Sequence, residues 1–204
     1  MDTREFWKEN AHLHIKPATG EEFPEGWDVK SYLAKVCDGE LITEIGCGEG
    51  RLSGAFHPEH YIGIDVSPKV LEIAENKNWE FKNYKYLLHN QGDSYPPADV
   101  RLVYTVLLHI DDGYIGDFIK NLCEGTERVV VAEIMERKWR RPGNPPVFNR
   151  EAEEYITLFE KCGFEKDYHN EKVYERYADP KFNKITEGLP VYITFLRFKK
   201  KNLQ

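Results

Sequence analysis

The feature that most constrains the fold of this chain is a short apolar run that ends in three alternating glycines. Leu41–Ile45 is followed at once by Gly46, Gly48 and Gly50. Because glycine lacks a Cβ atom, it lets the chain turn tightly and lets a ligand approach the backbone closely. A buried strand that runs into such a turn is typical of α/β sheets, where ligands bind beyond the carboxyl ends of the strands. The sequence therefore predicts a ligand-binding edge at this turn.

Five short apolar runs have the length and composition of strands. They are Leu41–Ile45, Tyr61–Ile64, Tyr84–Leu88, Val100–Val106 and Val129–Ile134. The middle runs are apolar at consecutive positions, as expected of parallel strands that are buried on both faces. Residues 165–176 and 190–199 instead alternate apolar and polar side chains, which indicates an antiparallel hairpin at the end of the sheet.

Amphipathic segments separate these runs. Apolar side chains recur at helical spacing within residues 29–36, 115–122 and 152–159, and Ser67-Pro68 has the N-cap and first-turn proline of a further helix. This alternation predicts one α/β domain over residues 28–204. Residues 1–27 are the least patterned part of the chain, and we expect an N-terminal arm or lid there.

The composition excludes several classes of protein. Of the 204 residues, 41% are hydrophobic and 31% charged, a globular balance rather than that of a disordered chain. The net charge of −7 disfavours nucleic acid as a partner. We find no apolar run near the roughly 18 to 20 residues needed to span a bilayer, and no signal-peptide pattern, so we expect a soluble, cytoplasmic protein. The four cysteines lack CxxC spacing, which favours reduced thiols over disulfides or zinc ligands.

An acidic residue stands where the next predicted strand ends. Asp65 follows Ile64, nineteen positions after Gly46. A carboxylate at this place can accept hydrogen bonds from both ribose hydroxyls of an adenosine moiety. The alternative interpretation is an acid that only stabilises the turn before Ser67.

Together these motifs resemble those of the class I S-adenosylmethionine (SAM) dependent methyltransferases. The first motif of that family is similar to Glu44-x-Gly46-x-Gly48-x-Gly50, and its second to Asp65. The spacing of the third glycine favours SAM over a dinucleotide. The resemblance extends through residues 99–110, with Val106–Ile110 like the family's VLxHI segment, and through residues 150–164. It implies a Rossmann-like, seven-stranded and mostly parallel sheet of order 3-2-1-4-5-7-6, with SAM over the first two strands.

The resemblance also implies a set of cofactor-binding residues, and two departures from the family pattern affect it. Thr105 stands where many members have Asp or Asn, so backbone carbonyls could bind the methionine amino group instead. After the third strand, either Asn90 or Asp93 could meet the adenine amino group, and we prefer Asn90 because it lies nearer the expected strand end. The expected cofactor-binding residues are Glu44, Gly46, Cys47, Gly48, Gly50, Asp65, Val66, Asn90, Gln91 and Thr105.

Methyl transfer from a sulfonium uses an already activated donor, so the protein must align the reactants and remove a proton from the acceptor. His109, after the fourth strand, is the candidate general base, because an ordinary histidine pKa near 6.5 suits this role. The alternative is a histidine bonded to the backbone at a helix entrance. Asp111 and Asp112 favour a helix start, although they could orient His109 or hold a metal. We expect no metal requirement.

A hydroxyl of a small molecule or sugar is the expected acceptor, because Thr105–Leu108 lacks the amino-methylation motif that follows the fourth strand in some relatives. Asn144–Val147 imitates that motif at an unrelated place. The stretch from Glu22 to Trp27 is similar to that of methyltransferases that modify glycans, and this resemblance adds a glycan to the expected acceptors. Methylation of a small amine and a non-catalytic SAM-binding subunit are the alternatives.

Contacts to the acceptor are expected from two places after the fifth strand. Glu133 ends that strand and is expected to face the same pocket. The following loop carries Trp139, Arg140 and Arg141, which could clamp an anionic or sugar-bearing acceptor. A solvated cationic loop is the alternative interpretation.

Overall fold

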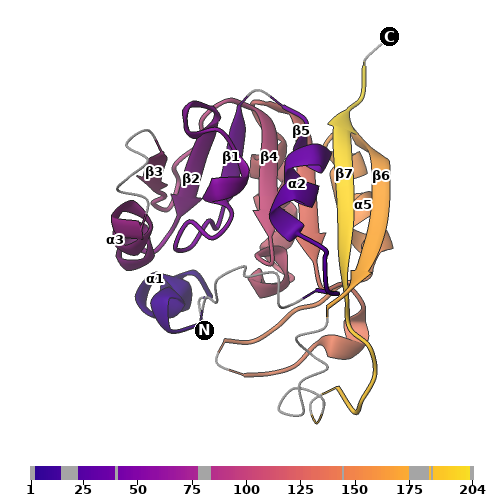
Figure 1. Cartoon of the computed structure of the whole chain (residues 1–204). Coiled ribbons are helices and arrows are strands. Elements are labelled where there is room, and N and C mark those ends of the chain that lie inside the picture. Colours follow the sequence, from indigo (N-terminus) through magenta and orange to yellow (C-terminus); the bar gives the residue numbers. More distant parts are fainter. Residues whose placement is uncertain are drawn as a thin grey trace.

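The centre of the molecule is a seven-stranded sheet in the order β3-β2-β1-β4-β5-β7-β6 (Figure 1). This computed structural model describes residues 3–14, 23–39, 41–77, 84–143, 145–174, 184 and 186–202. The strands are β1 (Ile42–Ile45), β2 (Tyr61–Asp65), β3 (Lys85–Leu88), β4 (Ala98–Tyr104), β5 (Thr126–Glu133), β6 (Phe164–Val173) and β7 (Tyr192–Lys200). β1 to β5 pair in parallel, whereas β7 runs antiparallel to β5 and β6. The predicted fold class, strand order and terminal hairpin are confirmed.

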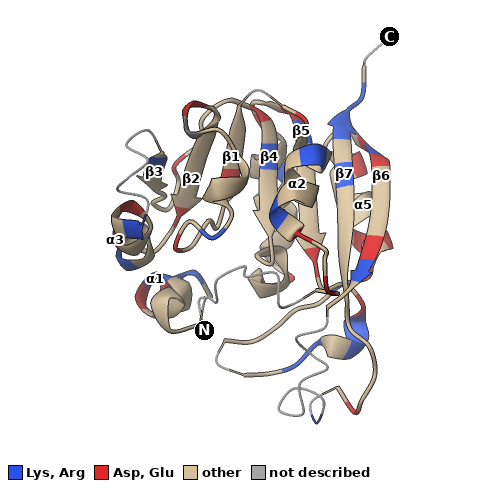
Figure 2. Cartoon of the chain, viewed as in Figure 1, with Lys and Arg blue, Asp and Glu red and all other residues tan. Residues whose placement is uncertain are grey.

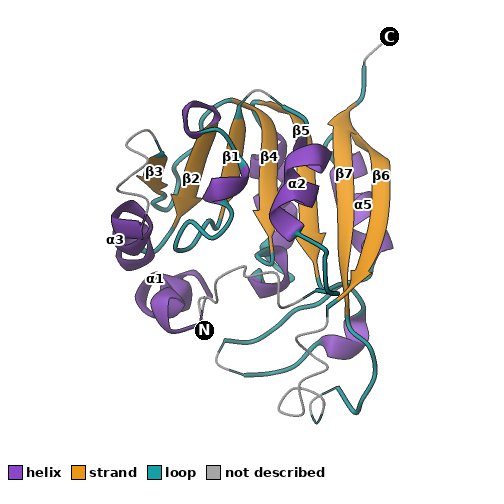
Figure 3. Ribbon diagram, viewed as in Figure 1, coloured by secondary structure: helices purple, strands orange, loops and turns teal. Residues whose placement is uncertain are grey.

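Helices cover both faces of the sheet (Figure 3). They are α1 (Thr3–His14), α2 (Val29–Cys37), α3 (Pro68–Lys77), α4 (Ile115–Cys123) and α5 (Ala152–Lys161), with short 3-10 helices at Ser53–Ala55, Pro58–His60, Leu107–His109 and Arg137–Trp139. The apolar side of α2 packs on one face of the sheet, and those of α4 and α5 pack on the other. All helices in the described ranges are too short or too polar to be membrane-spanning segments.

The fourth strand is shifted from its predicted position. The pattern predicts a strand from Val100 to Val106, whereas β4 ends at Tyr104. Thr105 adopts a φ of +55°, and this left-handed conformation cannot continue an extended ladder. The N–H of Val106 then donates to the side chain of Glu133 instead of to a neighbouring strand. The shift frees residues 105–110 to form the loop beyond the sheet edge.

The N-terminal segment contains a regular helix. α1 packs beside α3 at the carboxyl edge of the first strands (Figure 1). Its buried residues are Phe6 and Ala11, and Lys69 Nζ of α3 lies 3.1 Å from His12 Nε2. The chain therefore places a helix across the edge at which the ligand site was predicted.

Candidate active site

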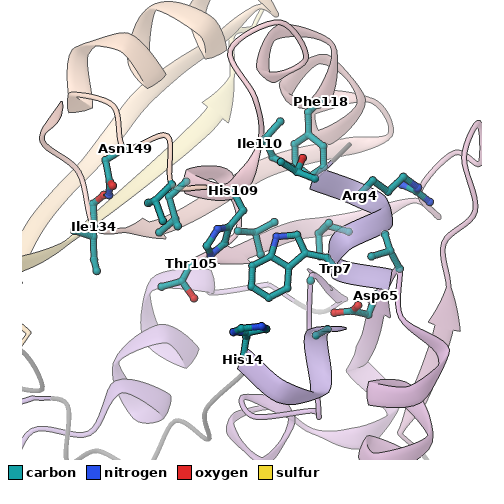
Figure 4. A pocket seen from close by; sticks show the side chains of 18 of the residues that line it. Arg4, Trp7, His14, Asp65, Thr105, His109, Ile110, Phe118, Ile134 and Asn149 are labelled. Carbon is teal, nitrogen blue, oxygen red and sulfur yellow. The ribbon is translucent and has the colours of Figure 1, made fainter. Parts of the chain in front are cut away.

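A cavity of about 500 Å³ opens beyond the carboxyl ends of β1, β2 and β4 (Figure 4). Small-molecule sites commonly measure about 300 to 1,000 Å³. One wall is a single face of α1, formed by Thr3, Arg4, Trp7, Ala11 and His14. The opposite wall comes from the loop after β4 and from the chain after β5. The site thus combines strand ends with a helix that is distant from them in sequence.

The turn after β1 depends on its glycines. Gly46, Gly48 and Gly50 have φ values of +74°, +56° and +68°, a region that residues with a Cβ atom rarely adopt. At Gly46, a Cβ atom would also lie only 2.4 Å from Cγ2 of Val106. The tight turn that the sequence predicts is present, and it brings the backbone of the first strand close to the loop after β4.

Asp65 joins this turn to β2 and also lines the cavity. Its Oδ2 accepts from the Gly48 N–H at 2.9 Å, and its Oδ1 accepts from the Ser67 N–H at 3.0 Å. Burial raises the pKa of this carboxyl, and the backbone donors oppose that effect. Because each carboxylate oxygen has two lone pairs, Asp65 can accept further hydrogen bonds from a ligand. The turn-stabilising and ligand-binding interpretations are therefore compatible.

Half of the expected cofactor-binding residues line the cavity: Gly46, Asp65, Val66, Gln91 and Thr105. Within the described part of the chain, the other five lie outside its wall: Glu44, Cys47, Gly48, Gly50 and Asn90. Glu44 is fully buried, and its Oε2 accepts from the Tyr61 hydroxyl at 2.5 Å. Burial raises the pKa of Glu44 to about 7. Asn90 is exposed, and its N–H donates to Asp93 at 2.7 Å. Cofactor contacts of all ten residues stay predictions.

Arg51 is a cavity residue that the sequence analysis does not assign. Its Nη2 donates to the carbonyl of Tyr104 at 2.5 Å and to Thr105 Oγ1 at 2.8 Å. The guanidinium also lies 4.5 Å from the ring centroid of Tyr104. Arg51 therefore links the glycine turn to the end of β4. Its position directly after Gly50 is the one signal in the sequence that could have found it.

His109 lies in the cavity wall at the end of a 3-10 helix. Its Nδ1 is 3.5 Å from the carbonyl oxygen of Pro146, and its ring centroid is 4.5 Å from that of Trp7 (Figure 4). Burial lowers the pKa of His109 to about 4, and the positive charges of Arg141 and Arg51 contribute. The ring is therefore neutral at pH 7. In the tautomer that donates from Nδ1 to Pro146, Nε2 retains its lone pair.

Two buried side chains, those of Glu133 and Arg150, fix the loop that carries His109. Glu133 Oε1 accepts from the N–H groups of Val106 and Leu107, both at 2.6 Å. Arg150 donates to the carbonyls of Leu107, at 3.1 Å, and Ile110, at 2.7 Å. Burial raises the pKa of Glu133 to about 8 despite these donors. The carboxylate of Glu133 is thus directed at backbone, and its contact with an acceptor stays a prediction.

Asp112 is part of an ion-pair cluster rather than the first turn of α4, which starts at Ile115. It accepts from Arg150 Nη2 at 2.6 Å and from Arg140. Although partial burial opposes the effect, these hydrogen bonds lower the pKa of Asp112. Asp111 accepts from the Gly113 N–H at 2.8 Å. The described residues hold no cluster of three His, Cys, Asp or Glu side chains that would suit a metal ion.

The loop after β5 carries several Lys and Arg residues (Figure 2), and only some of its residues line the cavity. Trp139 and Arg141 line the cavity, and Trp139 Nε1 donates to Glu136 Oε2 at 2.8 Å. Arg140 points to Asp112 and lies 5.6 Å from the ring centroid of Phe148. Of the three residues expected to clamp an acceptor, the structure brings two to the cavity.

Comparison with known proteins agrees with this geometry. Residues 42–127 match a family model described as a methyltransferase domain. The matched part contains β1 to β4, the glycine turn and His109. Over these residues the chain is similar to methyltransferase domains.

Two curated relatives of this chain are considerably longer than the matched region. Phosphoethanolamine N-methyltransferase 3 from Arabidopsis thaliana is 22% identical over 178 residues, which are 78% of this chain and 36% of the relative. The human protein named probable tRNA methyltransferase 9B is 30% identical over 86 residues, which are 39% of this chain and 19% of the relative. The chain therefore spans about a third and a fifth of these proteins.

Solved structures with the same fold include enzymes of different chemistry. Magnesium protoporphyrin IX methyltransferase from Synechocystis PCC 6803, solved with bound SAM, superposes with a TM-score of 0.68 at 14% identity and covers 98% of both chains. The [4+2]-cyclase SpnF has the same TM-score at 15% identity and covers 96% of this chain and 91% of its own. The shared fold therefore does not define the reaction or the acceptor of this chain.

Proposed function

We propose that this chain binds SAM in the cavity and transfers its methyl group to a hydroxyl of a small molecule, such as a sugar or glycan. The observation that carries the proposal is His109, a neutral imidazole in the cavity wall with Nδ1 directed at the Pro146 carbonyl. A hydroxyl acceptor must lose its proton as the methyl arrives, and Nε2 of such a ring can accept it. His109 is therefore the proposed general base.

The residues at the strand ends suit the cofactor. The positive-φ glycines leave the backbone uncovered, and Asp65 has lone pairs to spare for two ribose hydroxyls. Arg51 is well placed for the carboxylate of the methionine moiety, and the backbone of Thr105 for its amino group. SAM supplies an activated methyl group, so these residues need only bind and orient it. The SAM-bound structural relative supports this assignment.

Residues 1–27 would act as an arm over the bound reactants. Trp7 and His14 of α1 lie at the cavity, and Arg4 Nη2 donates to the carbonyl of His89 at 2.5 Å. A helix that covers the cavity in this way would exclude water, which strengthens electrostatic interactions around the reacting atoms. The free cysteines, of which Cys37, Cys47 and Cys123 are buried, support a reducing, cytoplasmic location.

Calorimetric titration with SAM and its demethylated product S-adenosylhomocysteine (SAH) tests the cofactor site. Gly48→Val should abolish binding, because a β-branched side chain at φ +56° distorts the turn that Asp65 holds. Gly54→Val is the matched control, since a Cβ atom there meets open space. Retained affinity in a folded Gly48→Val protein contradicts the assignment. A screen of phenols, glycosides and amines with methyl-labelled SAM then identifies the acceptor class.

A small amine is the second candidate acceptor. The Arabidopsis relative is named for N-methylation of phosphoethanolamine, and the rings of Trp7 and Trp139 in the wall could face an ammonium group. An amine that is neutral before attack needs no strong base. Transfer to amines that persists in His109→Ala would favour this candidate. SAM binding without transfer to any acceptor would favour a non-catalytic subunit.

A further inference from the structure

Residues 137–141 of the loop after β5 contain four cationic side chains, and the structure separates one of them from the rest. Three are paired with carboxylates: Arg137 with Glu154, Lys138 with Glu136, and Arg140 with Asp112. The guanidinium of Arg141 has no hydrogen-bond or ion-pair partner anywhere in the described ranges, although it lines the cavity. Charge alone does not distinguish these four residues, but their partners do.

The backbone at Arg141 is fixed relative to His109. Arg141 and Val147 exchange two backbone hydrogen bonds, of 3.1 and 3.0 Å, and Val147 is buried in the cavity wall. The N–H of Phe148 donates to the carbonyl of Leu108 at 2.7 Å. The Pro146 carbonyl faces His109 Nδ1. The Arg141 side chain therefore extends from a segment whose backbone is anchored to the loop that carries His109.

The charge of Arg141 acts on His109 and is not compensated there. After burial and the Pro146 hydrogen bond, Arg141 is the leading influence on the pKa of His109, and it lowers it. The other two arginines in the wall have other roles: Arg4 donates to the His89 carbonyl, and Arg51, proposed above for the methionine carboxylate, donates to Tyr104 and Thr105. A guanidinium with free donors in a cavity suits the two oxygens of a carboxylate or phosphate.

We propose that Arg141 binds an anionic group, a carboxylate or a phosphate, on the methyl acceptor and so selects acidic acceptors over neutral ones. This inference rests on the proposed function and specifies its substrate class. An anion on Arg141 also cancels part of the positive potential at His109, which makes the ring a stronger base when an acidic acceptor is present. Acceptor binding and base activation are then coupled through one side chain.

The experiment compares acceptors that differ by one anionic group. Titration with SAH first establishes cofactor binding, which tests the proposed function independently. The SAH complex is then titrated with 4-hydroxybenzoate and its methyl ester, glucose 6-phosphate and glucose, and phosphoethanolamine and ethanolamine. In at least one pair, the compound with the carboxylate or phosphate should bind about ten- to a hundredfold more tightly than the compound without it. This is the gain expected for a charge-assisted hydrogen-bonded pair. The pairs separate carboxylate from phosphate recognition.

Two variants assign the preference to its residue. Arg141→Gln should abolish the preference and leave SAH affinity unchanged. Lys138→Gln removes the same charge from the same loop, but from a side chain paired with Glu136, and should retain the preference. Equal binding within all three pairs, no binding of any anionic member, or a preference that survives Arg141→Gln overturns the proposal. A loss of SAH affinity in Arg141→Gln would assign this residue to the cofactor instead and also overturns it.

Discussion

At the Asp65 side of the cavity, polar side chains are held by the backbone of neighbouring strands, whereas at the Arg141 side they face the cavity with few partners. Asp65 accepts from two N–H groups, and Arg51 donates to a carbonyl and a hydroxyl. The His109 side chain has a single hydrogen-bond contact, at 3.5 Å, and Arg141 has no side-chain hydrogen-bond or ion-pair partner in the described part of the chain. The first side is a completed hydrogen-bond network, and the second is completed only by a ligand. Substitutions on the first side should therefore change stability together with cofactor affinity, and those on the second should change acceptor binding or reactivity with little change in stability.

The largest expected effect tests the second side. His109→Ala should lower turnover by about 10² to 10⁴, because a positioned general base typically contributes that factor. SAH affinity should stay near that of the wild type, and the melting temperature should change less than in variants of Asp65. The measurement uses an acceptor found in the screen at saturating SAM. Near-normal turnover in His109→Ala would indicate amine methylation.

The pH dependence of kcat/KM sharpens this test. With the pKa of His109 lowered to about 4, the imidazole is already unprotonated at pH 6, and the rate should be level from there to pH 8. It should fall only as the pH approaches 4. The groups that face the ring are Arg141, Arg51 and His14, with Trp7 and the Pro146 carbonyl. A step near pH 6.5 would mean that the ring is solvated in the working enzyme.

A smaller, double effect tests the first side. Asp65→Ala should weaken SAM binding about ten- to a hundredfold through the loss of charge-assisted hydrogen bonds. It should also lower the free energy of unfolding, because each backbone N–H left without its acceptor costs about 1 to 3 kcal/mol when buried. Asp65→Asn keeps one acceptor oxygen, so its SAM affinity and its free energy of unfolding should lie between those of the wild type and Asp65→Ala. A stability loss with an affinity change below twofold would leave Asp65 a purely structural role.

Beneath both sides, Glu133 should make stability depend on pH. Burial raises its folded-state pKa from 4.5 to about 8, so the folded chain binds more protons than the unfolded chain between these values. Its contribution is complete below about pH 4.5 and is lost as the pH rises through about 8. Glu133→Gln keeps the acceptor oxygen but does not titrate, so its urea-unfolding free energy should fall less steeply from pH 6.5 to 9. Equal slopes would contradict the raised pKa.

The last prediction is that removal of metal ions has no effect on turnover. Chelation with EDTA should leave turnover unchanged, because Asp112 is occupied by Arg140 and Arg150, and Asp111 by a backbone N–H. Loss of activity that magnesium or manganese restores would indicate metal-assisted deprotonation, and would recast His109 and Asp112 as ligands or their supports.

The strand-end residues were predictable because their signals are local. The glycines and Asp65 directly follow buried runs, so their place at the carboxyl edge follows from the pattern of the strands. The resemblance to a family supplied the strand order. The early end of β4 was not predictable, because it depends on the positive φ of Thr105 and on the distant carboxylate of Glu133.

The acceptor side could be predicted only in part, because its contacts join distant segments. Arg140 and Arg141 are adjacent and chemically alike, and the bridge between Arg141 and Val147 decides which of them reaches the cavity. Arg150 supports the loop of His109 from about forty positions away, and a buried arginine has no local sequence signal. The position of α1 could not be predicted either, because the helix face that lines the cavity contacts strand ends and loops that are distant in sequence.

The tilted pair of Trp7 and His109 has a consequence for acceptor binding. The indole occupies space beside the imidazole, so an acceptor that approaches the ring from that side must part the two rings first. Aromatic pairs of this kind are worth about 0.5 to 1.5 kcal/mol beyond their burial. The apparent dissociation constant of the acceptor is then its intrinsic value multiplied by the inverse of the open fraction, a factor of about two to ten. Shortening Trp7 should thus tighten acceptor binding even as it admits more water.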